Sequence, residues 1–388
     1  MAFPLTVGAK TEGFESPRLL KVVDVDTFIA GRWRPEHCVL LADEVHERLL
    51  GAPWGALCGR PNPQWHAPWI ERPALEPGFL PGDVIEIVPG RPNIRIAYRR
   101  GQRGNVLFAT ERCNSFCLMC SQPPRQLADD WRVNHNLQLV ELIDDDLPNL
   151  AITGGEPTLL GDGLLRMVEA CASRLPRTRL EILSNGRLFA APSHLDRVAD
   201  IGHPDIQWNI PLYADVASVH DYVVQSRGAF EQTCAGLVRL AEMKQAIEIR
   251  IVLHKASIPR LVETARFIFR NFTFARHIAL MGLEPIGFTL ANRDALWIDP
   301  ADYQDELVEA VGFLVQQGMA VSFYNLPLCT LDRRLWPFSR QSISDWKNIY
   351  LPQCEGCSAR TRCGGFFASI SEQWVSRKVA PIATSIGG

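Results

Sequence analysis

The middle of the chain alternates short apolar runs with amphipathic segments. Six runs have the β-branched, apolar character of buried strands, at residues 106–109, 151–153, 180–183, 206–212, 247–253 and 277–283. Segments between them have the apolar spacing of helices that cover a sheet, at residues 137–143, 164–174, 230–243 and 261–269. Repeated strand-helix units predict parallel strands joined by right-handed crossovers. We therefore predict an α/β fold with an incomplete barrel of six strand-helix units over residues 103–318.

The stretch before residue 103 does not follow this pattern. It is rich in proline, glycine and tryptophan, and a hairpin is predicted where residues 82–88 meet residues 94–98. We predict a small, mainly β N-terminal domain over residues 1–102. Five arginines give this domain a basic edge, which could hold an acidic peptide but is more often a solvated surface: Arg91, Arg95, Arg99, Arg100 and Arg103.

Charge and hydropathy narrow the class of protein. The 388 residues are 47% hydrophobic and carry a formal net charge of -3. No apolar run reaches the roughly 18 residues needed to cross a bilayer, and the first residues lack the apolar core of a secretory signal. We therefore expect a cytoplasmic protein that binds neither membranes nor nucleic acid. The acidic run Asp144-Asp145-Asp146 is expected to be a solvated helix end, not a metal site.

Three cysteines lie on one short stretch after the first predicted strand, at Cys113, Cys117 and Cys120. Their C-x3-C-x2-C spacing allows three thiolates to bind three irons of a cubic cluster and leaves the fourth iron without a protein ligand. A small chelating molecule can fill that open position. Taken alone, the spacing also allows a zinc knuckle or three reduced cysteines without a metal.

A second motif, Gly154-Gly155-Glu156, follows the second predicted strand. Two glycines let the backbone come close to a ligand, and Glu156 adds a carboxylate that can hold a cationic group. After the third strand, Ser184 and Asn185 stand where their side chains could bond a ribose hydroxyl or a carboxylate. Ordinary strand-ending turns use the same residues, so this alternative stays open for both motifs. In barrels of this type, ligands bind at the C-terminal ends of the strands, where these motifs fall.

Four more cysteines cluster near the C terminus, at Cys329, Cys354, Cys357 and Cys363, in a predicted extension over residues 319–388. Four thiolates suffice for a complete [4Fe-4S] cluster or a structural zinc site, and cysteine spacing does not distinguish the two. The remaining cysteines are scattered and are expected to be packed in the protein: Cys38, Cys58, Cys171 and Cys234.

The cysteine run from Glu111 to Cys120, followed by the Gly-Gly-Glu turn, resembles the radical SAM superfamily. The resemblance implies a TIM-like partial (β/α)6 barrel and a catalytic [4Fe-4S] cluster on the three cysteines of that run. It also implies S-adenosylmethionine (SAM), with its methionine amine held by the Gly-Gly-Glu turn. An electron from the cluster would cleave the sulfonium and release a 5'-deoxyadenosyl radical that abstracts hydrogen. In such enzymes the cofactor carries the hard chemistry and the protein orients it.

The stretch after the fourth predicted strand resembles the peptide-modifying members of that superfamily, in which a strand end leads to a His-Asp pair, here His220-Asp221. There are two departures. Pro211 stands where a serine is common, and Val224 lies near where an arginine is expected. Arg250, on the fifth strand, is a possible substitute for holding the methionine carboxylate. A strand arginine that faces solvent is the alternative.

Over roughly residues 100–375 the chain resembles the radical SAM maturases of the His-Xaa-Ser system. The resemblance lies in residues 109–124, 210–213 and 279–285 and in the C-terminal cysteines, which are similar to a SPASM/twitch-like extension with one auxiliary [4Fe-4S] cluster. It implies a peptide maturase that acts on a precursor peptide with His-Xaa-Ser repeats, together with a partner maturase and an electron donor. A radical SAM enzyme acting on a small molecule and a non-catalytic iron-sulfur or zinc protein are the alternatives.

Overall fold

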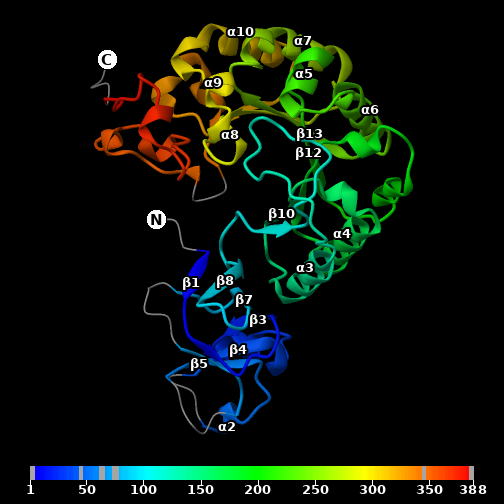
Figure 1. The fold of residues 1–388 in the computed structure, drawn as a ribbon. Helices are drawn as coiled ribbons and strands as arrows, with labels where there is room; N and C mark the ends of the chain where they lie inside the picture. The colour runs from blue at the N-terminus through cyan, green and yellow to red at the C-terminus, as the bar shows by residue number, and fades with distance from the viewer. Residues whose placement is uncertain (1–4, 43–46, 61–65, 72–77, 343–346, 384–388) are drawn as a thin grey trace.

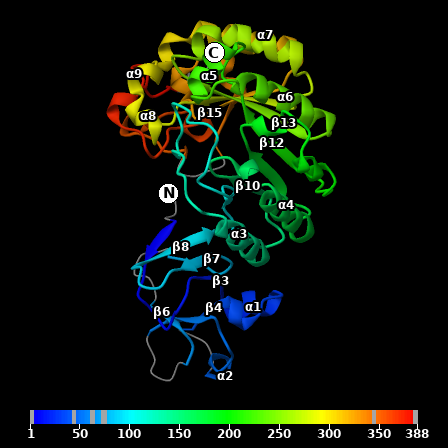
Figure 2. The ribbon, with the colours of Figure 1, turned by 45° about the vertical axis from the view of Figure 1, so that its right-hand side comes forward.

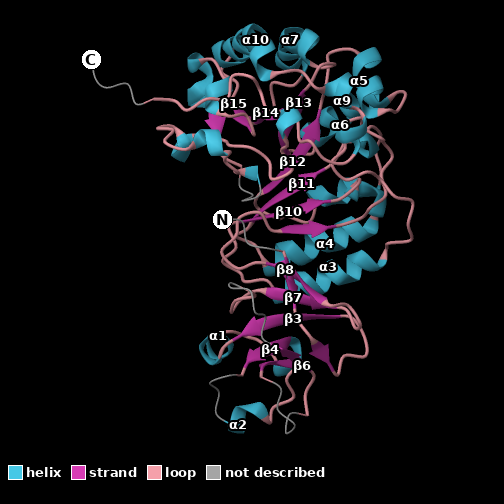
Figure 3. Ribbon diagram, turned by 60° about the vertical axis from the view of Figure 1, so that its left-hand side comes forward, coloured by secondary structure: helices cyan, strands magenta, loops and turns pink. Residues whose placement is uncertain are grey.

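The computed structural model describes residues 5–42, 47–60, 66–71, 78–342 and 347–383. These residues form two eight-stranded sheets, of which the second carries helices along one face (Figures 1 and 3). Among the described helices, none combines the length and the apolar character that a bilayer span requires.

The second sheet is parallel throughout, and its strands follow one another in chain order. Its strands are β9 (Val106–Phe108), β10 (Asn149–Thr153), β11 (Arg179–Leu183), β12 (Ile206–Pro211), β13 (Ala246–Leu253), β14 (His277–Gly282), β15 (Val321–Tyr324) and β16 (Ser339–Arg340). The six predicted strands are β9 to β14, so the predicted α/β fold with a parallel sheet is confirmed. The sheet continues past residue 318 with β15 and β16, which were not predicted.

Helices cover one face of this sheet, and the apolar residues at every second strand position pack against them. The helices of this region are α3 (Trp131–Leu142), α4 (Asp162–Arg174), α5 (Ala217–Val224), α6 (Ala229–Glu242), α7 (Leu261–Asn271), α8 (Phe288–Ala291), α9 (Arg293–Leu296) and α10 (Gln304–Gln316). On β13, Ile247, Ile249 and Ile251 are fully buried in the core that α3, α4, α6, α7 and α10 share. Because side chains alternate along a strand, Glu248 and Arg250 lie on the opposite face.

That opposite face is polar from β11 to β15. The Arg250 Nε donates to Glu248 at 2.6 Å, and the His277 Nδ1 lies 2.8 Å from the other oxygen of the same carboxylate. The His277 Nε2 lies 2.9 Å from the Ser322 hydroxyl. Buried polar groups are stable only when they are bonded, and this network bonds them to one another across neighbouring strands.

The N-terminal sheet is β-rich, as predicted, and lies beyond the β9 edge of the parallel sheet (Figures 1 and 2). The predicted hairpin is present as the antiparallel pair of β7 and β8. The strands and helices of this N-terminal domain are β1 (Thr6–Gly8), β2 (Thr11–Glu12), β3 (Arg18–Val23), α1 (Val25–Ala30), β4 (Cys38–Leu41), α2 (Glu47–Leu50), β5 (Ala56–Gly59), β6 (Trp69–Glu71), β7 (Val84–Ile87) and β8 (Asn93–Tyr98). Strands β3, β4, β5 and β6 pair in parallel.

The predicted basic edge of this domain is paired with carboxylates in part. Arg99 is buried and its guanidinium donates to Asp83 at 2.9 Å. Arg95 donates to Glu86 at 2.5 Å. The remaining arginines of the edge, Arg91, Arg100 and Arg103, are exposed, so the solvated surface favoured from the sequence fits most of this edge.

The acidic run after α3 is not fully solvated either, so that expectation was wrong for Asp144. Its carboxylate accepts a hydrogen bond at 2.8 Å from the ammonium of Lys21, whose side chain is 0% exposed. The same ammonium lies 4.6 Å from the centre of the Trp33 ring. Burial lowers the pKa of Lys21, and Asp144 opposes that shift. This ion pair joins the N-terminal sheet to the end of α3.

Replacing Asp144 with alanine is expected to lower the free energy of unfolding by about 3 kcal/mol, because the Lys21 ammonium would stay buried without its partner. Urea denaturation measures this loss. Lys21→Met should cost less, since it removes the cation along with its desolvation penalty. Asp145→Ala is the matched control, because its carboxylate is 57% exposed. Equal losses for the Asp144 and Asp145 variants would contradict the role of the buried pair.

Candidate metal centre

The loop that carries Cys113, Cys117 and Cys120 begins at the C-terminal end of β9 and returns to α3. The backbone amides of Phe116 and Leu118 donate to carbonyls in the last turn of α5, at 3.0 and 2.9 Å. All three cysteine side chains are half-buried and form no disulfide. The loop is therefore held along its length against α5 and presents three thiols at one edge of the sheet.

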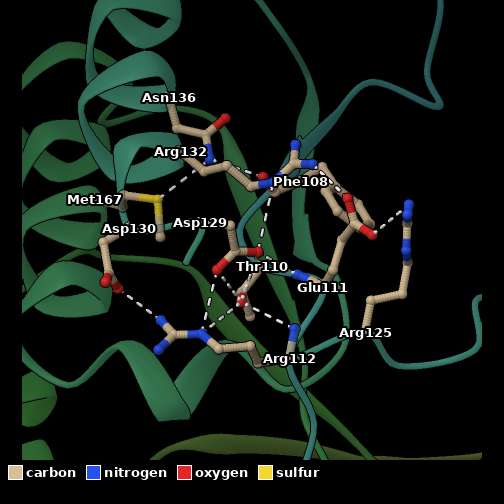
Figure 4. Close-up of polar contacts among 10 residues, drawn as sticks. All are labelled: Phe108, Thr110, Glu111, Arg112, Arg125, Asp129, Asp130, Arg132, Asn136 and Met167. Atoms are coloured by element: carbon tan, nitrogen blue, oxygen red, sulfur yellow. Dashed lines mark hydrogen bonds and ion pairs between the residues drawn. The ribbon is translucent and has the colours of Figure 1, made fainter. Parts of the chain in front are cut away.

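A polar cluster joins the two ends of this loop (Figure 4). Asp129, only 2% exposed, accepts from the Thr110 hydroxyl at 2.9 Å and from the Glu111 amide at 2.6 Å. Its carboxylate also lies 3.2 Å from the Arg112 Nε, and Arg132 donates to Glu111 at 2.7 Å. No sequence pattern assigned these residues a role, and their one local signal is their place on either side of the cysteine run.

The two glycines of the second motif lie against the cysteine loop. The Gly155 amide donates to the Thr110 carbonyl at 2.7 Å, and the Glu156 amide donates to the Arg112 carbonyl at 2.8 Å. A Cβ atom on Gly154 would lie 2.4 Å from the Thr110 oxygen, and one on Gly155 would lie 2.1 Å from the Arg112 oxygen. Glycine is thus required at both positions because two backbone segments approach each other closely. The sequence predicted a different reason, the approach of the backbone to a ligand.

The Glu156 side chain is fully buried, and its carboxylate is satisfied by protein donors. One oxygen accepts from the hydroxyls of Thr158 and Ser184, at 2.6 and 2.8 Å. The other accepts from the Asn185 amide at 2.6 Å. Burial raises the pKa of Glu156, and these hydrogen bonds oppose that shift. Glu156 therefore ties the end of β10 to the end of β11, while its role in holding the methionine amine stays a prediction.

The turn after β11 reaches the cysteine loop. The side-chain amide of Asn185 donates to the Asn114 side chain at 2.6 Å. Arg187 donates to the Asn114 carbonyl at 2.5 Å and to the Ser115 hydroxyl at 2.9 Å. The structure thus brings together the cysteine loop, the Gly-Gly-Glu turn and the Ser184-Asn185 turn at the C-terminal ends of β9, β10 and β11. The predicted bonds of Ser184 and Asn185 to a ligand stay predictions.

The side chains of the His-Asp pair both accept hydrogen bonds from backbone amides. Asp221 accepts from the amides of Gly228 and Phe230, at 2.6 and 2.8 Å, and so fixes the turn that starts α6. The His220 Nδ1 accepts from the Tyr213 amide at 3.2 Å, and the two rings stack with 5.7 Å between their centroids. Burial raises the pKa of Tyr213, and the three loop cysteines add to that shift, so the stack lies near the cysteine loop.

Arg250 does not face open solvent. Its guanidinium is engaged by Glu248 and lies 3.7 Å from Glu181, on the polar face of the sheet. Both the arginine and its acidic partners are mostly covered. The role of Arg250 in holding a methionine carboxylate stays a prediction.

Burial controls the protonation of the loop thiols. It raises the pKa of Cys113 to about 11 and that of Cys117 to about 12, and it also raises the pKa of Cys120. Each of the first two shifts is increased by a neighbouring loop cysteine, so the three sulfurs lie within electrostatic range of one another. Without a bound cation these thiols stay protonated near neutral pH, and a metal would reverse that preference.

The four C-terminal cysteines also come together. Cys354 and Cys357 contribute to the raised pKa of Cys363, and Cys354 and Cys363 contribute to that of Cys329, although burial is the main cause in both cases. Residues 25 to 34 positions apart in sequence are therefore neighbours in the fold.

Backbone amides point at two of these sulfurs. The Leu328 and Gly365 amides donate to the Cys363 sulfur at 3.3 and 3.4 Å, and the Ile382 amide donates to the Cys357 sulfur at 3.3 Å. Amide donors stabilise thiolates and tune the metals bound to them. No set of three or more His, Cys, Asp or Glu side chains in the described ranges is grouped as a single metal ion requires. A cubic cluster binds each thiolate at a different iron, and the chemistry of both cysteine sets fits that group.

Comparison with known proteins agrees with this geometry. A family model described as the radical SAM superfamily matches residues 107–268. A search of curated proteins found no match.

Several solved structures are similar to the chain. SuiB of Streptococcus suis bound to S-adenosylmethionine has 18% identity and a TM-score of 0.42, covering 56% of this chain and 49% of SuiB. The protein anSMEcpe with bound AdoMet and Cp18Cys peptide has 14% identity and a TM-score of 0.43, covering 56% of this chain and 62% of anSMEcpe. A radical SAM methyltransferase from Sphaerobacter thermophilus has 12% identity and a TM-score of 0.42, covering 68% of this chain and 74% of the methyltransferase.

The chain thus spans less than two thirds of SuiB and of anSMEcpe, and likenesses at these TM-scores assign no function to it. The family match is different, because it covers the cysteine loop, the Gly-Gly-Glu turn and the strands that hold them. Residues 107–268 therefore form a radical SAM superfamily domain.

Proposed function

We propose that this chain is a radical SAM enzyme that modifies a ribosomally made precursor peptide of the His-Xaa-Ser repeat type. It would cleave SAM reductively and abstract hydrogen from the peptide. A radical SAM domain indicates an enzyme and implies a [4Fe-4S] cluster and SAM. The finer assignment, to a maturase similar to HxsC, is supported by the resemblance over roughly residues 100–375. The observation that carries the proposal is a second set of four cysteines beyond the domain, where the Leu328 amide, next to Cys329 in sequence, donates to the Cys363 sulfur at 3.3 Å.

Cys113, Cys117 and Cys120 would hold the catalytic cluster, since three half-buried thiols on one loop match a cluster that keeps one iron open. Gly154, Gly155 and Glu156 lie directly beside them. When bound, the cluster supplies an electron and SAM supplies the hydrogen-abstracting group. The remaining work of the chain is to orient these groups and to exclude water.

The segment that contains α8 and α9 lies over the cysteine loop (Figure 1). The Phe288 amide donates to the Cys120 carbonyl at 2.9 Å, and the Asn292 side chain donates to the Leu118 carbonyl at 2.9 Å. Met119 and Leu296 are both buried in one apolar cluster. This cover keeps water from one side of the loop, which protects a reactive radical from side reactions.

Cys329, Cys354, Cys357 and Cys363 would hold one auxiliary [4Fe-4S] cluster. Backbone amides donate to the sulfurs of Cys357 and Cys363, and such donors tune the metals bound by those sulfurs. In this role the second cluster would ligate the peptide or accept an electron after hydrogen abstraction. The proposal includes a partner maturase and an electron donor, with the precursor peptide encoded near the enzyme's gene.

Cys357→Ala is expected to spare SAM cleavage without peptide but to abolish the modified peptide, because the first cluster stays intact. Mass spectrometry of the peptide and chromatography of 5'-deoxyadenosine measure the two outcomes. Cys234→Ala, at a half-buried cysteine on α6, is the control and should retain both. Modified peptide from the Cys357 variant would overturn the auxiliary role. Turnover with a small molecule but not with the peptide would overturn the peptide assignment.

A further inference from the structure

Arg187 stands on the short 3₁₀ helix Arg187–Phe189, directly after β11. It is half-buried and reaches across to the cysteine loop. One terminal nitrogen donates to both Asn114 and Ser115, at 2.5 and 2.9 Å, and the Nε donates to the Gln232 side chain at 2.7 Å. Asn114 and Ser115 are the residues that follow Cys113 in the cysteine run. The guanidinium is therefore fixed beside the loop, and Gln232 of α6 accepts a hydrogen bond from its Nε.

The charge of Arg187 has no acidic partner. In the part of the chain that the structure describes, its hydrogen bonds go to neutral oxygens and it forms no ion pair. Other arginines near the sheet edge differ, since Arg112 lies 3.2 Å from Asp129 and Arg132 lies 2.7 Å from Glu111. A partly buried cation without a counter-ion is costly, so its position against the loop that carries the three cysteines points to an anion bound there.

The anion that suits this position is the cluster on the loop thiolates. Each thiolate adds negative charge, and one-electron reduction adds more. A fixed cation stabilises the more negative, reduced state of a cluster over the oxidised state.

We propose that Arg187 is a positioning residue that supplies the fixed positive charge for the cluster held by Cys113, Cys117 and Cys120, and that this charge eases the one-electron reduction of the cluster. The inference rests on the proposed function and deepens it. In the step concerned, a reductant gives one electron to the cluster, and no bond to the protein forms or breaks. Removal of the charge should make the cluster harder to reduce.

The test is a redox titration of the reconstituted full chain, followed by electron paramagnetic resonance, at low ionic strength and without SAM or peptide. Arg187→Gln should shift the midpoint potential in the negative direction. Arg187→Lys, which keeps the charge but not the forked hydrogen bonds, should recover most of the shift. The exposed Arg197, 3.4 Å from Asp162, gives the control Arg197→Gln, which should leave the potential unchanged.

A second variant separates charge from loop position. Gln232→Glu places a carboxylate of the same shape next to the Arg187 Nε, while the contacts of Arg187 with Asn114 and Ser115 can stay. Gln232 is exposed, so this change should not disturb folding. It should shift the potential in the negative direction as well, though less than Arg187→Gln, because solvent screens an exposed pair.

The outcomes are distinct. An unchanged potential in Gln232→Glu overturns the inference, whether or not Arg187→Gln retains iron. Equal potentials for Arg187→Lys and Arg187→Gln would also overturn it, because the hydrogen bonds rather than the charge would then set the potential. If the wild-type chain binds no iron-sulfur cluster, the proposed function itself fails, and this result is read from the iron content before any titration.

Discussion

Alanine in place of Cys117 is expected to abolish the release of 5'-deoxyadenosine from SAM, with a loss on the order of 100-fold or more. Cys117 lies between the other two loop cysteines, and its carbonyl accepts the Cys120 amide at 2.9 Å within the turn that presents them. With two thiolates left, one of the three irons bound by the loop loses its ligand. The measurement is chromatography of the nucleoside after anaerobic reconstitution with iron, sulfide and a strong reductant.

The matched control for this experiment is Cys234→Ala. Cys234 is a half-buried cysteine on α6 that packs against the main core, and burial raises its pKa to about 12. It should retain both its iron content and its rate of release. Wild-type rates in the Cys117 variant would mean that SAM cleavage does not depend on the loop cluster, and the proposed function would fall with that result.

The strands of the parallel sheet could be predicted where the sequence holds a long apolar run. On β13, six of the eight residues are apolar, so the run was clear. β15 has four residues and β16 has two, which gives the period of a strand too little length to be recognised. In contrast, α10 has buried apolar residues at helical spacing, at Leu307, Ala310, Val311 and Leu314, and could have been predicted.

The meeting of the two motifs could also be predicted, because both follow parallel strands and the ends of such strands share one edge. The physical reason why glycine stands at these two positions could not be predicted from the sequence. It depends on backbone atoms of Thr110 and Arg112, more than forty residues earlier, which approach Gly154 and Gly155 too closely for any Cβ atom. The residues around Gly154 and Gly155 in sequence do not indicate such an approach.

Charges were the least predictable part of the molecule. Asp144 was expected to be solvated because its neighbours in sequence are acidic, yet its partner Lys21 lies 123 residues away. Asp129 and Arg187 carry no motif of their own and became visible only through their bonds to the cysteine loop. The sequence therefore predicts the groups that would bind the cofactors, whereas the residues that contact and position those groups required the fold.

Gly155→Ala is expected to weaken iron binding about 10- to 100-fold and to lower the free energy of unfolding by about 2 to 3 kcal/mol. The new Cβ would lie 2.1 Å from the Arg112 oxygen, a backbone atom that cannot rotate away. The cysteine loop would have to move, and the hydrogen bond from the Glu156 amide to that oxygen, at 2.8 Å, would be strained. Iron analysis after reconstitution and thermal unfolding of the apoprotein measure the two effects separately.

Gly312→Ala provides the matched control within the same chain. Gly312 lies in α10, and a Cβ atom added there meets nothing within 4 Å. Alanine favours a helix over glycine by about 1 kcal/mol, so this variant should unfold at a slightly higher temperature and bind iron as the wild type does. Since both changes add one methyl group, a difference between them reports the close approach of β10 to the cysteine loop. Wild-type iron binding by the Gly155 variant would show that the loop can move without losing its cluster, and the close approach would then not be what holds the three thiols in place.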